Sequence, residues 1–296
     1  MGLMIKGIIA FILALENGFK MVEEQTLATS FTSSGVGLHS GEEVTVTVKP
    51  AQAGEGRYFV RTDLPEAPSI SATVEAVSQT QLSTELQQGQ ATVRTVEHLL
   101  SALFGLGVDH ARIEINGPEV PLLDGSALSW TQQIQRVGRV SCQVPKQKGL
   151  VLNSPVSVQE KDAIVAAFPA DQTQLSYAVD YPVDAIGQQW LSWYPEKGDY
   201  ESAIAPARTF VLAKQIEALQ QAGLIKGGSL DNALVCGEQG WLNPPLRFAN
   251  EPVRHKLLDL VGDLSLLGIF PQAHIFAYKA SHHLHIRLAK ELMRTT

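Results

Sequence analysis

The stretch Thr95-Val96-Glu97-His98-Leu99-Leu100-Ser101-Ala102-Leu103, with Ala111-Arg112-Ile113-Glu114-Ile115 soon after it, sets the first expectations for the fold. Apolar residues in the first stretch recur at the spacing of one helical face. Thr95 is a candidate N-cap for this helix, and Gly105 and Gly107 are candidate stop signals. The second stretch alternates polar and apolar residues, as a half-buried strand does. A helix followed closely by a strand is therefore predicted.

The same mixture extends in both directions from this stretch. Further strands are predicted at 42–49, 58–62, 151–159, 163–168, 175–180 and 274–278, and further helices at 126–137, 210–222, 251–267 and 282–293. Pro145-Lys146-Gln147-Lys148-Gly149 breaks the composition and predicts a linker. Because strands and helices do not alternate as βαβ units, we predict an α+β fold. The expected form is two similar layered α+β domains, 21–145 and 150–296, with the active site between them.

Composition narrows the class of protein. The 296 residues are 45% hydrophobic and 18% charged, which is ordinary for a soluble enzyme of one or two domains. The net charge of -7 argues against nucleic-acid binding, which requires a basic surface. Cys142 and Cys236 form no CxxC pair, so a thiolate zinc site is not expected. Two unpaired cysteines suit a cytoplasmic protein.

Residues 1–20 differ from the rest of the chain. The apolar run at 7–15 follows Lys6 and resembles the start of a signal peptide, but no small-residue cleavage site follows it. The run is also shorter than the roughly 20 apolar residues that span a bilayer as a helix. We interpret 1–20 as a leader or a misassigned N-terminal extension before Met21, with a membrane-surface helix as the alternative. No stable membrane span is expected.

Three histidine clusters carry the chemistry. His255 and Asp259 are four residues apart and share one side of a helix. Glu97-His98 opens a second helix, and His282 opens a third. Each cluster alone is weak, because such residues commonly form a solvated helix face. Together they offer two imidazoles and a carboxylate as zinc ligands, and further groups for general acid and general base catalysis. Amide hydrolysis needs those parts and a donor for the oxyanion.

At these residues the chain resembles the UDP-3-O-acyl-N-acetylglucosamine deacetylases, zinc amidases of lipid A biosynthesis. The resemblance runs from about Gln25 to Leu292. Its motifs are Gly35-Val36-Gly37-Leu38-His39-Ser40-Gly41, the helical stretch at 95–103, Gly117-Pro118-Glu119-Val120-Pro121, Asp124-Gly125-Ser126-Ala127, Ala207-Arg208-Thr209-Phe210, Gly227-Gly228-Ser229-Leu230-Asp231-Asn232-Ala233, and Val253-Arg254-His255-Lys256-Leu257-Leu258-Asp259 with Gly262-Asp263-Leu264.

The resemblance implies a role for each matching residue. His98, His255 and Asp259 match the zinc ligands, and Glu97 matches the general base. His282, as an imidazolium, would stabilise the oxyanion and protonate the leaving amine. Asp263 would orient and charge that histidine, and Thr209 would donate to the oxyanion. The matching substrate-binding residues are Lys256, Phe210, Leu212, Gly228 and Leu82. The insert at 212–230 would wall the acyl passage, and His39 has a match without an assigned role.

The implied reaction is zinc-dependent hydrolysis of the N-acetyl group of UDP-3-O-acyl-N-acetylglucosamine, the committed step of lipid A biosynthesis. The products are UDP-3-O-acyl-glucosamine and acetate. One zinc per chain is expected, and Fe²⁺ suits the same nitrogen and oxygen ligands. The protein would be a cytoplasmic monomer. The alternatives are an amidase for another acylated amino sugar, a catalytically silent nucleotide-sugar-binding homologue, and a membrane-surface protein held by 1–20.

The sequence departs from the family pattern near the third cluster. Ser281 replaces the usual glycine, while His283 and His285 stand where a small residue and an asparagine are usual. Either His282 or His283 could then be the acid, and the spacing from Tyr278-Lys279 favours His282. Pro252 replaces an aromatic residue, which a first helical turn tolerates. None of these changes removes a predicted ligand.

Overall fold

The computed structural model describes residues 22–147 and 149–295. The interpretation of residues 1–20 as a leader or extension therefore lies outside the described residues. Among the residues that the structure describes, none of the helices combines the length and the apolar composition of a membrane span.

The first half of the chain builds a five-stranded sheet. The strand order is β2 (Phe31–Val36), β3 (Glu43–Pro50), β9 (Ala111–Ile115), β4 (Arg57–Arg61) and β5 (Ser69–Ser71). Only the β9–β4 contact in this sheet is parallel; the other three contacts are antiparallel. The alternation predicted at 42–49 is realised in β3, where Val44, Val46 and Val48 are buried between less buried neighbours. These valines anchor the sheet to the core.

The second half builds a sheet with the same plan. Its main strand order is β12 (Val156–Glu160), β13 (Ala163–Pro169), β19 (Pro271–Tyr278), β14 (Gln174–Asp180) and β15 (Gln188–Trp193), and β11 (Leu150–Val151) adds a short parallel pair with β19. As in the first sheet, the last strand in sequence is inserted between the second and the third. It again runs parallel to one neighbour and antiparallel to the other. The two halves therefore share one topology.

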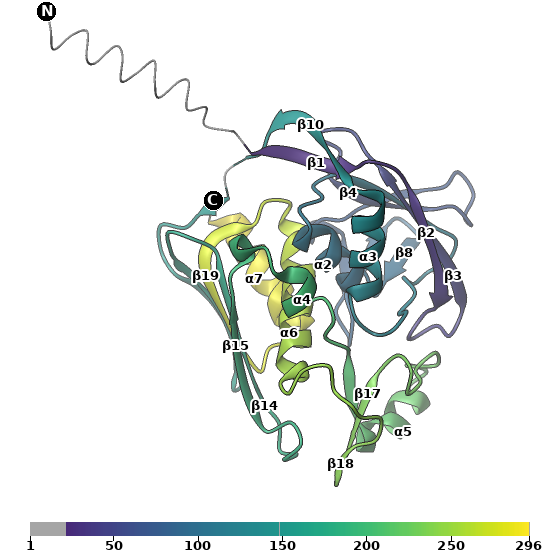
Figure 1. The fold of residues 1–296 in the computed structure, drawn as a ribbon, viewed down its shortest axis with the longest axis vertical. Helices are drawn as coiled ribbons and strands as arrows, with labels where there is room; N and C mark the ends of the chain where they lie inside the picture. The colour runs from purple at the N-terminus through teal and green to yellow at the C-terminus, as the bar shows by residue number, and fades with distance from the viewer. Residues whose placement is uncertain (1–21, 148, 296) are drawn as a thin grey trace, which may run out of the picture.

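The main helices occupy equivalent places in the two halves. α2 (Glu97–Gly105) precedes β9 and α3 (Leu128–Val137) follows it; α6 (Glu251–Leu264) precedes β19 and α7 (His282–Arg294) follows it. The helices lie between the two sheets (Figure 1), and α2 packs against α6. A Cβ added to Gly262 would lie 2.2 Å from the backbone oxygen of Glu97, so this glycine permits the close approach.

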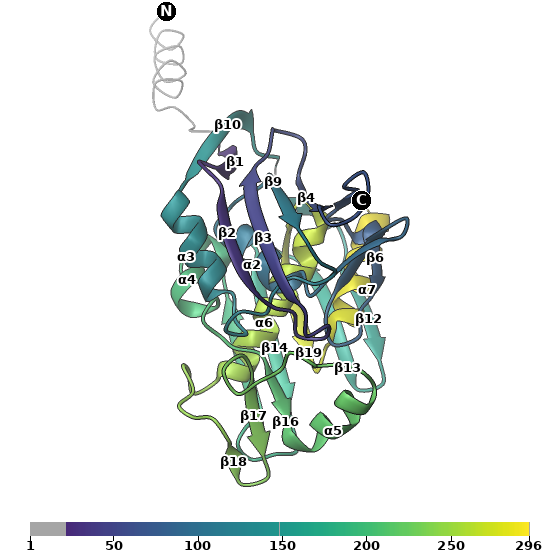
Figure 2. The ribbon, with the colours of Figure 1, turned by 90° about the vertical axis from the view of Figure 1, so that its right-hand side faces the viewer.

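Smaller elements extend this plan. Figure 2 shows α5 and the small sheet of β16 to β18 at the end of the molecule away from β1 and β10. The remaining elements are β1 (Glu23–Leu27), β10 (Arg139–Pro145), β6 (Val77–Gln79), β7 (Glu85–Gln88), β8 (Ala91–Arg94), α4 (Tyr200–Ala203), β16 (Phe210–Leu212), α5 (Ala213–Gln221), β17 (Leu234–Gly237), β18 (Gly240–Trp241), and the 3₁₀ turns η1 (Val74–Ala76), η2 (Pro195–Lys197) and η3 (Ser265–Leu267).

The structure confirms the α+β class and corrects several local predictions. Thr95 is not an N-cap: its φ is +56°, and its hydroxyl donates to Glu119 instead. The helix predicted over 210–222 begins only at Ala213, because the preceding residues form β16 and pair with β17. The strand predicted over 151–159 is divided between β11 and β12. The division into domains 21–145 and 150–296 stays a prediction.

Candidate metal centre

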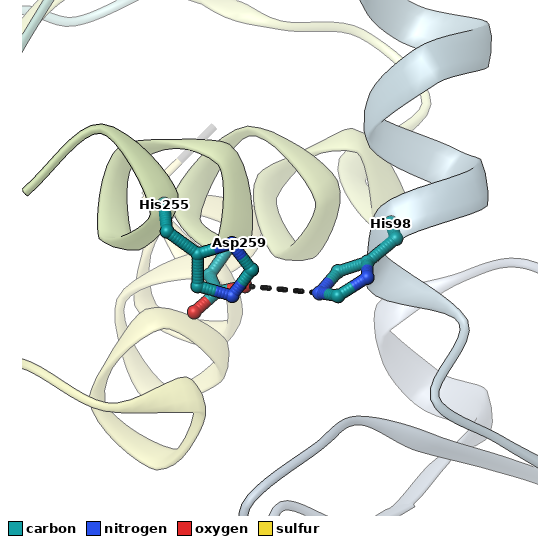
Figure 3. Close-up of side chains that lie close together, drawn as sticks. All are labelled: His98, His255 and Asp259. Carbon is teal, nitrogen blue, oxygen red and sulfur yellow. Dashed lines mark ion pairs between the residues drawn. The ribbon is translucent and has the colours of Figure 1, made fainter. Parts of the chain in front are cut away.

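The three predicted ligands lie together where α2 meets α6. His98 comes from the first turn of α2, and His255 and Asp259 come from successive turns of α6 (Figure 3). Their ligand atoms lie within 4.8 Å of one another, and all three side chains are buried. Asp259 Oδ1 is 3.4 Å from His255 Nε2 and 3.7 Å from His98 Nε2. Tetrahedral zinc with bonds of about 2.1 Å sets its ligand atoms about 3.4 Å apart, so the arrangement fits.

Hydrogen bonding around the three residues also fits a metal. Asp259 Oδ1 and His98 Nδ1 are buried and have no hydrogen-bond partner among the described residues. His255 Nδ1 lies 3.0 Å from the carbonyl oxygen of Ala207 and donates to it, so its Nε2 carries the free lone pair. Burial lowers the pKa of His255 to about 4, which keeps this imidazole neutral. A cation would satisfy the buried oxygen that is otherwise unpaired.

Glu97 stands beside His98 in the first turn of α2. Its Oε2 accepts a hydrogen bond from the backbone N–H of Thr84 at 3.1 Å. Burial raises the pKa of the Glu97 carboxyl, although His282 and His98 oppose that effect. A carboxyl with a raised pKa is a suitable proton acceptor near neutral pH.

His282 faces Glu97 from the start of α7. Its Nε2 lies 3.9 Å from Glu97 Oε1 and 3.9 Å from Asp259 Oδ2, while its Nδ1 lies 2.8 Å from Asp263 Oδ2. Burial lowers the pKa of His282, but the carboxylates of Asp263, Asp259 and Glu97 outweigh burial and raise it to about 9. The raised pKa favours the imidazolium form of His282 at neutral pH, which can donate a proton or a hydrogen bond.

The two histidines left open by the sequence lie in different surroundings. The side chain of His283 is 54% exposed, with Glu160 as an ion-pair partner at 3.9 Å. His282 is buried and lines the same cavity as His98, His255 and Asp259. The geometry therefore favours His282 over His283 as the acid. His285 is buried as well, contacts Asp263 Oδ2 through its Nδ1, and is not among the residues that line the cavity.

A cavity of about 570 Å³ opens onto these groups. Its lining includes every substrate-binding residue that the sequence predicts, together with Thr209 and His39: Lys256, Phe210, Leu212, Gly228, Leu82, Thr209 and His39. Lys256 Nζ contacts Asp259 Oδ2 at 2.8 Å and lies 6.0 Å from the centre of the Phe210 ring. Burial lowers the pKa of Lys256, but Asp259 outweighs burial and raises it. The cavity thus joins a cation to apolar walls.

Several residues on the cavity wall have strained backbones. Leu82, Thr95, Ile225 and Lys279 line the cavity and have φ between +50° and +62°, a region that residues with a Cβ rarely adopt. Such strain persists only where surrounding contacts hold it, and it is common at functional sites.

Two residues that hold the site through hydrogen bonds, Thr84 and Glu119, were not predicted from the sequence. Thr84 donates from its backbone to Glu97 and from its hydroxyl to Asp263 Oδ1 at 2.6 Å. Glu119 is buried and accepts hydrogen bonds from the hydroxyl of Thr95 and the backbone N–H groups of His39 and Ser40. Glu119 belongs to the family motif Gly117-Pro118-Glu119-Val120-Pro121, and this membership is a sequence signal for its role. Thr84 had none, because nothing local distinguishes it from a surface threonine.

Fold and site together define a class: an α+β protein whose buried pair of histidines and carboxylate, with a further carboxylate and imidazole beside them, suits metal-dependent hydrolysis. A family model described as UDP-3-O-acyl N-acetylglycosamine deacetylase matches residues 24–294. The chain belongs to this family.

Curated relatives agree with that assignment. The chain is 58% identical over 277 residues to UDP-3-O-acyl-N-acetylglucosamine deacetylase of Nostoc sp., a match that covers 92% of this chain and 99% of the relative. The protein of the same name from Synechocystis sp. is 58% identical over 271 residues, covering 91% and 98%. A probable deacetylase of this name from Arabidopsis thaliana, labelled mitochondrial, is 47% identical over 290 residues, covering 91% and 87%.

Proposed function

We propose that this protein hydrolyses the N-acetyl group of UDP-3-O-acyl-N-acetylglucosamine in a zinc-dependent reaction, giving UDP-3-O-acyl-glucosamine and acetate. The observation that carries the proposal is the convergence of His98, His255 and Asp259 with Glu97 and His282 in one cavity. Membership of a deacetylase family supports the same reaction. This step would belong to lipid A biosynthesis.

His98, His255 and Asp259 would hold one metal ion. Zinc accepts this ligand set, and Fe²⁺ can occupy similar sites. When bound, zinc supplies Lewis acidity and lowers the pKa of a bound water towards about 7. The neutral state of His255 supports metal binding, because an imidazole must be unprotonated to act as a ligand.

Glu97 and His282 would divide the proton transfers between them. The Glu97 carboxylate accepts the proton of the attacking water. The His282 imidazolium, held by Asp263, stabilises the oxyanion and then protonates the leaving amine. The Thr209 hydroxyl is a further donor on the cavity wall. Glu97 lies on α2 and His282 on α7, with His282 Nε2 3.9 Å from Glu97 Oε1, so an amide bound beside this pair can reach both groups.

The cavity wall suits an acylated nucleotide sugar. Phe210, Leu212 and Leu82 offer apolar surface for a fatty acyl chain, and Gly228 lines the same cavity. Ile225 and Leu230 belong to the same apolar wall. Lys256 offers a positive charge for the diphosphate or the sugar. These features support a substrate that is polar at one end and apolar at the other.

The proposed active form is a cytoplasmic monomer. All the residues named in the mechanism come from one chain, so the site needs no second copy for completion. The two cysteines, Cys142 and Cys236, are both free, which supports a reducing compartment.

Deacetylation of a series of UDP-3-O-acyl-N-acetylglucosamines by the wild type, Glu97→Gln and Glu97→Ala tests the function. We expect acetate release by the wild type, and a fall in kcat of about 10²- to 10⁴-fold in both variants, because each removes the proton acceptor. Release of no acetate by the wild type, with retained binding of the nucleotide sugar, would identify a silent homologue. Full activity in Glu97→Ala would remove Glu97 as the base.

A further inference from the structure

Asp263 is a buried carboxylate with three side-chain donors. Its Oδ1 accepts from the Thr84 hydroxyl at 2.6 Å, and its Oδ2 accepts from His282 Nδ1 and from His285 Nδ1, each at 2.8 Å. Asp263 and His285 are both fully buried. The resemblance to the deacetylase family accounts for His282 on this carboxylate but not for a second imidazole. His285 stands where the family pattern has an asparagine.

The two imidazoles reach the carboxylate from the same helix. His282 and His285 are three residues apart on α7, so their side chains share one face of its first turn. That face meets α6 at Asp263. An ionised carboxylate can only accept hydrogen bonds, so Nδ1 of each ring must carry the proton. This holds for His285 whether its ring is neutral or charged.

The far side of His285 is also fixed. Its Nε2 lies 3.2 Å from the Tyr177 hydroxyl, which itself lies 2.8 Å from the carbonyl oxygen of Ala280. Burial lowers the pKa of His285, which favours the neutral ring with Nδ1 protonated. The ring thus has one defined orientation between β14 and α6, and it cannot turn without breaking a buried hydrogen bond.

We propose that His285 is a positioning residue for the reaction: its Nδ1–H holds the Asp263 carboxylate in the one rotation that aims His282 Nε2 at the cavity. The second donor occupies one side of Oδ2, so His282 must use the other. Without it, Thr84 is the one side-chain donor among the described residues that holds the carboxylate independently of His282, and the His282 ring loses its defined direction. His285 is not among the residues that line the cavity, so it acts through Asp263 and not on the substrate.

The proposal rests on the proposed deacetylase function, and three substitutions at one position test it. His285→Asn keeps a donor, because the amide nitrogen is as many bonds from the Cα as Nδ1 is. His285→Gln moves the donor one bond further, to the distance of Nε2. His285→Leu removes it. His283→Leu is the matched control, since His283 is an exposed histidine of the same helical turn.

We expect kcat to fall about 10- to 100-fold in His285→Leu and His285→Gln, with KM and metal content unchanged, because supporting hydrogen bonds around a site carry effects of that size. His285→Asn should retain most of the wild-type kcat, and His283→Leu all of it. A wild-type kcat in His285→Gln, or an equal fall in His285→Asn and His285→Gln, overturns the proposal. That pair still decides the matter if His285→Leu does not fold.

A second readout needs no substrate. In the metal-loaded full chain, NMR should detect the slowly exchanging His282 Nδ1–H proton that donates to Asp263. We expect this signal to persist at its wild-type position in His285→Asn and to move or broaden in His285→Gln. An unchanged signal in both variants overturns the proposal. A wild type that releases no acetate would contradict the deacetylase function, while the NMR comparison would still decide the role of His285.

Discussion

In the first half of the chain α2 precedes β9 and α3 follows it, and in the second half α6 precedes β19 and α7 follows it. The two sheets have the same strand order, yet the four helices differ in what they supply. α2 supplies Glu97 and His98 from its first turn alone. α6 supplies residues from three successive turns, and α7 supplies His282. α3 supplies none of the candidate site residues.

This difference shows how a repeated scaffold acquires a single site. The crossing of α2 and α6 belongs to both halves, and Gly262 sets how closely the helices approach there. The chemistry depends on which side chains face that crossing. The equivalent helix α3 buries Trp130, Thr131 and Ile134 instead, which contribute packing. Topology alone would not have identified the site.

The largest expected effect comes from removing a residue at the crossing. Asp259→Ala or His98→Ala should weaken metal binding enough for the metal to be lost on dialysis, and lower kcat by about 10³-fold or more, because a catalytic metal contributes several kcal/mol to the transition state. Metal analysis after dialysis and acetate release are the measurements. If either variant retained both metal and activity, the pairing of α2 with α6 in one site would be wrong.

A smaller effect is expected from changing Asp263, the α6 carboxylate that binds His282 at the start of α7. His282 is protonated below its pKa of about 9, so activity that needs the imidazolium is present below that pH and is lost as pH rises through it. Asp263→Asn removes the nearest negative charge and should lower the pKa of His282 by about 1–3 units. The alkaline limb of the kcat profile should therefore move to lower pH. An unmoved limb would mean that another group titrates there.

The smallest effect on activity is expected in α3. Ile134 is fully buried, so Ile134→Val should lower the free energy of unfolding by about 0.5–1.5 kcal/mol. The kcat of the folded variant should equal that of the wild type, because α3 carries no site residue. Denaturant unfolding and the acetate assay measure the two quantities separately. A marked loss of kcat would show that α3 shapes the site after all.

Local periodicity predicted much of this architecture. The helices at 95–106, 251–267 and 282–293 and the strand at 42–49 have strong patterns, and each has a counterpart close to its predicted range. The prediction over 210–222 was wrong at its beginning, because β16 depends on pairing with the distant β17. Thr95 has the composition of an N-cap, but the buried Glu119 binds its hydroxyl. In both cases, contacts with residues distant in the sequence determined the local structure.

Local sequence patterns predicted less of the candidate site than of the fold. His255 and Asp259 share a helix face by spacing alone. Their meeting with His98 could not be derived from the residues, since more than 150 positions of chain fold between them; it followed from the resemblance to a known family. Thr84 stayed unrecognised because its contacts with Glu97 and Asp263 exist only in the folded protein.

X-ray absorption at the zinc edge tests the central claim most directly, that both halves hold one metal. The zinc-loaded wild type should show two imidazole nitrogens and carboxylate oxygen at about 2.0–2.2 Å. His98→Ala and His255→Ala, each loaded at high zinc, should both show one imidazole fewer. The same two-imidazole spectrum from His98→Ala and the wild type would contradict the account, because α2 would then contribute no ligand.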